Sequence, residues 1–352
     1  SKPDLSENFA NIFLDKGNNP ESIFIEDFKL KSGKVHAFTV ANQPRFGAEE
    51  EEGGRLNPSL NLVQSFEKLD NTLAPFNTAQ LYTNQTEIFA GRDARLAGTV
   101  ILPGTSFKGR NVDIWAGYQL ADGSIITGDD RGAQKTLPGQ TTPVQVVGFD
   151  GPVANKEFTA QSGFYIRKYL DPAAGSGSRG TNSEVAFIRY RYAEVLLNAA
   201  EAAFELDQKD VAAGYLNQVR ARAGLTIPLT AADITFDRIV HERRVELAFE
   251  GHRLYDMKRW RLAHIVWDGT AMSEADLITD IGKAAKRVTQ PFGLWPYRIY
   301  NPASPDNGKW LYKIIKPGLV TGANRFQFGN YYSFIDDNIR ANNPKIVRQP
   351  NQ

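Results

Sequence analysis

HERRVELAFEGHRLYDMKRW, residues 241–260, is the stretch on which the predicted fold depends. It places Glu242, Glu246 and Glu250 four residues apart on one face of a predicted helix, with arginines between them and Gly251 directly after them. Clustered carboxylates beside a histidine occur in catalytic or metal sites and also in structural ion-pair networks. The surrounding sequence has to decide between these two interpretations.

Cationic side chains lie close to each of these carboxylates in the sequence. Glutamates at i, i+4 spacing repel one another by about 0.2–0.5 kcal/mol per pair. We expect local pairs to offset this repulsion: Arg238 with Glu242, Arg243 with Glu246, Glu250 with Arg253, and Asp256 with Arg259. An unpaired buried charge is destabilising, so charged groups beside a packed helix seam have to be paired. The predicted structural ion-pair network contains Glu242, Arg243, Glu246, Glu250 and Arg253.

A metal or catalytic site in this stretch is the alternative. The chain has no cysteine, no H-E-x-x-H motif and four histidines, which leaves few ligands for a transition metal, and we expect no cofactor and no metal. A glycoside hydrolase would need Glu246 and Glu250 to face an open cleft across a sugar, and neighbours on one packed helix rarely do so. The sequence also lacks a G-x-S-x-G nucleophile elbow and a phosphate-binding loop.

The composition is that of a folded protein without a strong overall charge. Hydrophobic residues make up 41% of the 352 residues, charged residues make up 23%, and the net charge is +1. These values argue against disorder and against nucleic-acid binding driven by overall basicity. No apolar stretch approaches the length of a transmembrane helix. The run EEEE at 49–52 indicates a solvated loop, with a structural cation site as the alternative.

The pattern of apolar residues changes near residue 181. Over 1–180, short apolar runs alternate with Gly, Pro and Asn, which predicts loops and short strands with few helices, one of them at 58–69. Over 181–266 the apolar residues recur at helical spacing and predict a helical repeat core. For 267–352 we expect an irregular region.

Two helices and a third that covers them are predicted inside this core. The first two end at Gly224, which suits a C-terminal cap, and their length and small residues resemble a tetratricopeptide-type unit. A single unit cannot bury its own faces. We therefore expect one long helix at about 236–266, which begins after Thr235 and packs against the pair.

Motifs along the chain resemble the signatures of the RagB/SusD family of nutrient-binding outer-membrane lipoproteins. The specific ones are RYAEVLLNAAEAAFEL at 191–206, LNQVRARAGL at 216–225 and the stretch at 242–260, with weaker matches at 20–28, 91–100, 163–171 and 342–352. The resemblance implies a mainly α fold: a tetratricopeptide-like helical repeat scaffold with long irregular loops and short β-hairpins. Family members are longer and begin with a lipidated cysteine. We therefore expect 1–352 to be the C-terminal major part of one SusD-like domain.

The resemblance also implies a function. Family members bind glycans or peptides at the cell surface and are not enzymes. We thus expect binding of oligo- or polysaccharide, delivery to a partner SusC-like TonB-dependent transporter, and a lipid anchor, on a preceding segment, at the outer membrane of a Gram-negative bacterium. Two alternatives stay open: a peptide-binding member of the same family, and a glycoside hydrolase that uses Glu246 or Glu250.

A glycan site needs aromatic rings for the flat faces of sugars and planar polar side chains for their hydroxyl groups. The segment 110–124 offers such residues between turn formers, and Tyr82 is a further candidate. The predicted ligand-binding residues are Arg110, Asn111, Trp115, Tyr118 and Tyr82. Trp115 is either a binding platform or a plug that fills the core beneath this loop.

Overall fold

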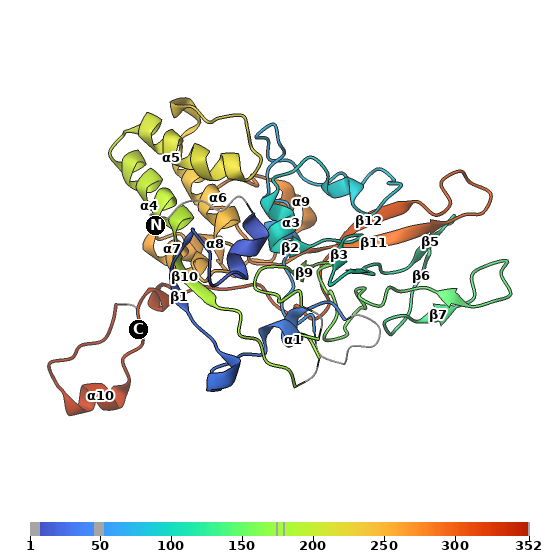
Figure 1. The fold of residues 1–352 in the computed structure, drawn as a ribbon, viewed down its shortest axis with the longest axis horizontal. Helices are drawn as coiled ribbons and strands as arrows, with labels where there is room; N and C mark the ends of the chain where they lie inside the picture. Colours follow the sequence, from blue (N-terminus) through green and yellow to red (C-terminus); the bar gives the residue numbers. More distant parts are fainter. Residues whose placement is uncertain (1–7, 46–52, 174, 179, 351–352) are drawn as a thin grey trace.

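The computed structural model describes residues 8–45, 53–173, 175–178 and 180–350. The EEEE run and its alternative as a cation site lie outside these residues. Helices gather at one end of the molecule and the longer strands extend toward the other (Figure 1). Among the described residues, more belong to helices than to strands. The shorter helices are α1 (Phe38–Asn42), α2 (Leu60–Val63), α3 (Arg95–Thr99), α9 (Glu274–Ile278) and α10 (Asp337–Asn342).

The helical end is built on an antiparallel pair, α4 (Tyr192–Glu205) and α5 (Lys209–Arg222). Asp207, at φ 55°, makes the turn between them, and Gly224, at φ 79°, follows α5 as the sequence predicted. The facing sides are small and apolar, and their buried members include Ala193, Leu196, Ala200, Ala212, Leu216 and Val219. Helix α6 (Phe236–Glu246) covers this pair and contributes Ile239 to the same cluster.

The prediction of one long helix at 236–266 is wrong, because the chain breaks after α6. Phe249 and Gly251 both have positive φ values, 64° and 87°, which an α-helix cannot contain. The chain resumes as α7 (Arg253–Arg259) and α8 (Ala263–Val266). The expected helix at 58–69 is likewise reduced to α2, since the backbone of Lys68 and Leu69 pairs instead with the segment at 91–92.

The other end of the molecule contains a four-stranded sheet. Its order is β12 (Trp310–Ile315), β11 (Gly293–Tyr300), β5 (Tyr118–Leu120) and β6 (Ile125–Ile126), and β11 runs parallel to β5. The two longest of these strands lie in the region 267–352 that we expected to be irregular, since Pro296 and the flanking Gly and Pro residues indicated loops. The short sheets pair β1 (Ser22–Glu26) with β10 (Phe187–Arg191), β2 (Val100–Ile101) with β9 (Tyr165–Ile166), β3 (Ser106–Phe107) with β4 (Arg110–Asn111), and β7 (Gln134–Lys135) with β8 (Val144–Gln145).

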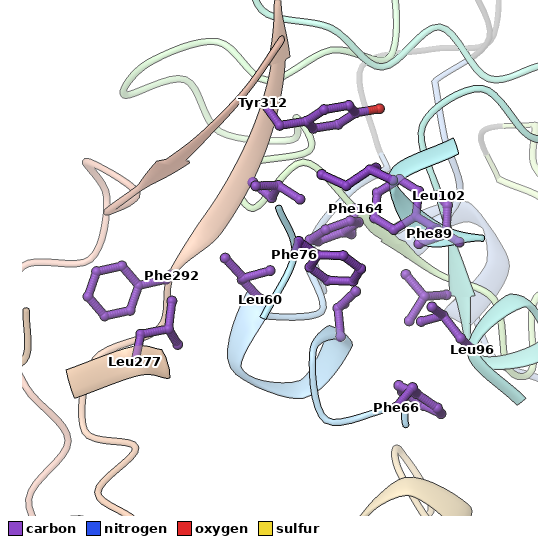
Figure 2. Packing of buried hydrophobic residues seen from close by; sticks show 14 of the residues in the cluster. Leu60, Phe66, Phe76, Phe89, Leu96, Leu102, Phe164, Leu277, Phe292 and Tyr312 are labelled. Atoms are coloured by element: carbon purple, nitrogen blue, oxygen red, sulfur yellow. The ribbon is translucent and has the colours of Figure 1, made fainter. Parts of the chain in front are cut away.

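A large aromatic core joins the two ends. Phe89 lies at its centre and meets Phe76, Phe164 and Tyr312 edge to face, with ring centroids 5.2, 6.0 and 5.9 Å away. Figure 2 shows these rings together with Leu60 of α2. Such pairs add about 0.5–1.5 kcal/mol each beyond the burial of apolar area. The sheet is therefore held firmly against the helical frame.

Candidate functional site

The three clustered carboxylates are buried inside the protein. Glu242 and Glu246 are 0% exposed, and Glu250, in the turn that follows α6, is 4% exposed. Their cationic partners come from other parts of the chain: Arg95, Lys168, Arg191, Arg220 and Arg222. The cluster thus connects α6 to the segments that pack on it.

Glu246 lies at the centre of this network. Its Oε2 accepts a hydrogen bond from Arg95 Nη1 at 2.8 Å, and its Oε1 accepts one from Arg191 Nη1 at 2.6 Å. Arg222 Nη2 donates a further hydrogen bond to the same Oε1. Arg95 Nη1 also donates to Glu242 Oε1 at 2.6 Å. Glu246 thus pairs with three guanidinium groups, and Arg95 pairs with two of the glutamates, so each buried charge has a partner.

The remaining carboxylates complete the pairing. Glu250 accepts from Arg191 Nε at 2.7 Å and from Lys168 Nζ at 2.8 Å. Three further buried carboxylates pair with these cations and with Arg238: Asp93 with Arg95, Glu21 with Arg191 and Arg222, and Glu67 with Arg220 and Arg238.

Three of the four local pairs that we expected are wrong. Arg238 pairs with Glu67, and Arg243 with Asp256 at 3.0 Å. Arg253 makes no ion pair with a described residue, so it lies outside the network that we assigned to it. The pair of Asp256 with Arg259 does form, at 2.8 Å. Arginines from the elements packed on α6 already pair with Glu242 and Glu246, which leaves no role for their neighbours in the helix. The helix also breaks at Gly251, so Glu250 and Arg253 do not share one helix face.

The pairing keeps these carboxylates ionised. Burial alone would raise the pKa of Glu242, but Arg95 and Arg220 outweigh it and lower this pKa to about 2. Burial also opposes ionisation of Glu246, yet Arg222, Arg191 and Arg95 hold its pKa well below the ordinary value. A general acid near neutral pH needs a raised pKa and access to substrate. Neither Glu242 nor Glu246 has these properties.

A row of side chains crosses the four-stranded sheet, at the end of the molecule away from the buried carboxylates. In register, Tyr118 of β5 lies opposite Arg298 of β11, and Arg298 lies opposite Trp310 of β12. Partners in register point to the same face of a sheet. The Arg298 guanidinium lies over both rings, 5.8 Å from the centroid of Tyr118 and 5.3 Å from that of Trp310. We call Tyr118, Arg298 and Trp310 the ring row; all three side chains are half-buried.

The structure places the sequence-predicted ligand residues in different environments. Tyr118 belongs to the ring row. Trp115 is 5% exposed, its indole N–H donates to Asp113 Oδ1 at 2.8 Å, and its ring packs edge-on against Tyr118, with centroids 5.4 Å apart. Tyr82 is 6% exposed, and its hydroxyl donates to the Asn77 carbonyl. These two rings therefore lie beneath the surface rather than on it.

The other two predicted residues lie apart from the ring row. Arg110 and Asn111 are exposed on β4, in the separate β3–β4 hairpin. Sequence reasoning missed Arg298 and Trp310. The alternation in WPYRIY at 295–300 and in WLYKII at 310–315 is the signal that could have indicated two strands, and hence two rings on one face.

The described residues contain neither a cluster of three candidate metal ligands nor a helix that could span a bilayer. Within residues 8–45, 53–173, 175–178 and 180–350, no three His, Cys, Asp or Glu side chains are grouped so that they could hold a metal ion. Of the helices in this part of the chain, none combines the length and apolar character needed to span a bilayer.

Comparison with known proteins gives consistent matches. A model of the SusD family matches residues 20–351. The SusD-like protein P2 of Formosa agariphila is 40% identical over 113 residues, which cover 29% of this chain and 22% of that protein. Two solved structures from Bacteroides fragilis are each 21% identical to the chain. One, a SusD-like protein, has a TM-score of 0.60 and is covered over 55% of its length by 95% of this chain. The other is described as a SusD-like carbohydrate binding protein and has a TM-score of 0.59. The match covers 97% of this chain and 58% of that structure.

The lengths of these relatives differ from that of the chain. The chain spans between half and two thirds of the two solved structures, and about a fifth of the Formosa protein is matched. At 21% identity the structural matches concern the fold. The fold of this chain is SusD-like.

Proposed function

The chain belongs to the SusD family, and from that premise we propose that it binds oligo- or polysaccharide at the cell surface through the ring row. The observation that carries this proposal is the placement of two half-buried rings on either side of the Arg298 guanidinium. Aromatic faces stack on the C–H faces of sugars, and guanidinium N–H groups donate to hydroxyl oxygens. The description of one solved relative as a carbohydrate binding protein also supports it.

Neighbouring residues support the ring row in this proposal. Trp115 lies against both rings, with centroids 5.4 Å from Tyr118 and 6.4 Å from Trp310, and thereby fixes their orientation. Tyr82 pairs with Trp310 through backbone hydrogen bonds in both directions. In our proposal these two residues position the rings, and Arg110 and Asn111 supply polar contacts to a ligand that extends beyond the row.

We further propose the cellular setting that the family suggests. The bound glycan passes to a SusC-like TonB-dependent transporter in the outer membrane of a Gram-negative bacterium, where a lipid anchor holds the protein. We infer that α4, α5 and α6 form a tetratricopeptide-like unit, and that 1–180, 181–266 and 267–352 are parts of one SusD-like domain. Because the buried carboxylates are fully paired, the proposal assigns the protein no hydrolytic role.

A calorimetric screen of the purified chain tests this function. The panel contains neutral and acidic oligosaccharides on one side and peptides of similar size on the other. We expect heat of binding with at least one oligosaccharide and unchanged oligosaccharide on chromatography afterwards. Binding of peptides alone would favour the peptide-binding alternative. Hydrolysis that disappears in Glu246→Gln would favour the glycoside hydrolase.

A further inference from the structure

A pocket lies between the α6–α7 turn and two distant segments of the chain. Its volume is about 330 Å³, and the segments around 59–62 and 288–291 form the walls opposite the turn. Cavities of this size hold small ligands. Helices α6 and α7, with the turn between them, supply much of the lining of the pocket. They lie at the helical end of the molecule, whereas β5, β11 and β12, which carry the ring row, lie at the other end (Figure 1). An inference about the pocket is therefore independent of the proposed glycan site.

The charges around this pocket do not balance. Arg243, Arg244 and Arg253 line it together with one carboxylate, Asp256. That carboxylate is already shared, because its Oδ2 accepts from Arg243 Nε at 3.0 Å and its Oδ1 accepts from Arg259 Nε at 2.8 Å. Arg244 and Arg253 are thus left with no carboxylate of their own among the described residues.

Neither of these two arginines has a strong acceptor. Arg244 Nη2 donates to the backbone carbonyl of Asn61 at 2.9 Å, which is a neutral partner. The guanidinium of Arg253 has no hydrogen-bond partner among the described residues. The contrast with the buried network is clear, since every guanidinium that holds Glu242 or Glu246 is paired at 2.9 Å or less.

Holding these charges costs free energy. Burial lowers the pKa of Arg253 to about 9, with the nearby charge of Arg244 acting in the same direction and Asp256 opposing it. Burial lowers the pKa of Arg244 to about 10. An arginine nevertheless stays protonated at neutral pH. Arg244 and Arg253 are both half-buried and line the cavity, so the protein keeps two poorly compensated cations at its wall, where an anion would pair with them.

The remaining walls indicate what kind of anion fits. Phe249, Trp267 and Val288 supply an apolar lining, and Asn324 supplies a neutral polar group. Guanidinium forks bind carboxylates with two parallel hydrogen bonds. We propose that this pocket binds a small organic carboxylate, whose oxygens pair with Arg244 and Arg253 and whose body packs against Phe249 and Trp267.

Calorimetry and thermal unfolding of the purified chain test this proposal. The probes are benzoate and glucuronate, the neutral controls are benzamide and glucose, and sulfate tests for a general oxyanion site. We expect at least one of the two carboxylates to bind and to raise the melting temperature, and the neutral molecules to have no effect. No binding of either carboxylate would overturn the proposal. Sulfate binding as tight as that of the carboxylates would overturn the assignment to carboxylates.

Variants locate the binding in the pocket. Arg253→Gln keeps a planar polar group but removes the charge, and we expect affinity for the bound carboxylate to fall about tenfold or more, as loss of one charge-assisted contact implies. Arg244→Gln should have the same effect. Arg287→Gln is the matched control, because Arg287 is paired with Asp268 outside this pocket. Without ligand, Arg253→Gln should melt no lower than the wild type. Equal affinity in Arg253→Gln and wild type would contradict the proposal. The rise in the melting temperature of the wild type on addition of a carboxylate is a test that needs no variant.

Discussion

Arg95 and Glu242 are 147 residues apart in the sequence, and an ion pair of 2.6 Å joins them in a site where both side chains are 0% exposed. Arg95 opens helix α3 in the loop-rich first half of the chain, and Glu242 belongs to α6 in the helical half. The pair therefore links the two parts through desolvated charge. Removing one partner leaves the other buried and uncompensated, and the predictions about stability follow from this relation.

Glu246→Gln should strongly destabilise the protein. The substitution removes the charge that Arg95, Arg191 and Arg222 share, and breaking a buried pair in this way costs about 3–5 kcal/mol. The free energy of unfolding in urea measures the effect. Glu26→Gln is the control, since Glu26 pairs with Arg189 at the surface, and we expect no measurable change there. A Glu246→Gln variant as stable as the wild type would show that this network does not hold the frame.

The protein should lose stability in acid over a defined range. The folded pKa of Glu242 is about 2, below its ordinary value of 4.5. A carboxylate with a depressed pKa stabilises the folded state above its unfolded pKa, and this contribution is lost as the pH falls through the folded pKa. The free energy of unfolding should therefore decrease steadily from pH 4.5 toward pH 2. A free energy that stays constant across this interval would contradict the assigned pairing.

Asp150 should have the opposite effect. Burial raises the pKa of Asp150 to about 8, with the charge of Asp113 adding to the shift, and its Oδ1 is buried with no hydrogen-bond partner among the described residues. A carboxyl group with a raised folded pKa is destabilising once the pH exceeds its unfolded pKa, and most so above the folded value. Asp150→Asn should therefore gain stability relative to the wild type as the pH rises from 4 to 8. Unfolding in urea at both ends of that range measures the difference in stability between the variant and the wild type. A difference that does not change with pH would disprove the prediction.

Trp115 and Tyr118 should respond differently to truncation. Trp115 is buried, so Trp115→Ala should cost about 3–5 kcal/mol of stability through the cavity that it leaves. Tyr118 is half-buried, so Tyr118→Ala should cost less stability and act chiefly on ligand affinity. Urea unfolding of both variants separates the two roles. A Trp115→Ala protein of wild-type stability would contradict the structural role assigned to the indole.

The sequence predicted that the three clustered glutamates had to be paired but could not identify their partners. Clustered carboxylates beside an apolar seam are too costly to bury alone, and that argument holds for any fold. The partners depend on long-range packing: Arg191 and Glu21, 170 residues apart, meet only because β1 pairs with β10. Local spacing therefore suggested Arg253 as a partner of Glu250, whereas Arg191 and Lys168 take that position.

The ring row depends on register in the same way. Tyr118 could be selected from the sequence because it stands among turn formers and polar residues. Trp310 could not be joined to it, since the parallel pairing of β5 with β11 brings together strands about 180 residues apart. A shift of one residue in that pairing would send the Arg298 side chain to the opposite face. The break after α6 was also missed: Gly251 permits positive φ, but Phe249, where positive φ first occurs after α6, is not a residue type that indicates it.

Affinity electrophoresis in gels that contain single polysaccharides tests the central claim most directly. The wild type, Tyr118→Ala and Tyr190→Ala run side by side; Tyr190 is an exposed tyrosine on β10, outside the ring row. We predict that at least one polysaccharide retards the wild type and Tyr190→Ala equally, and that Tyr118→Ala binds about tenfold more weakly, as loss of one stacked ring implies. Equal retardation of Tyr118→Ala and wild type would contradict binding at the ring row.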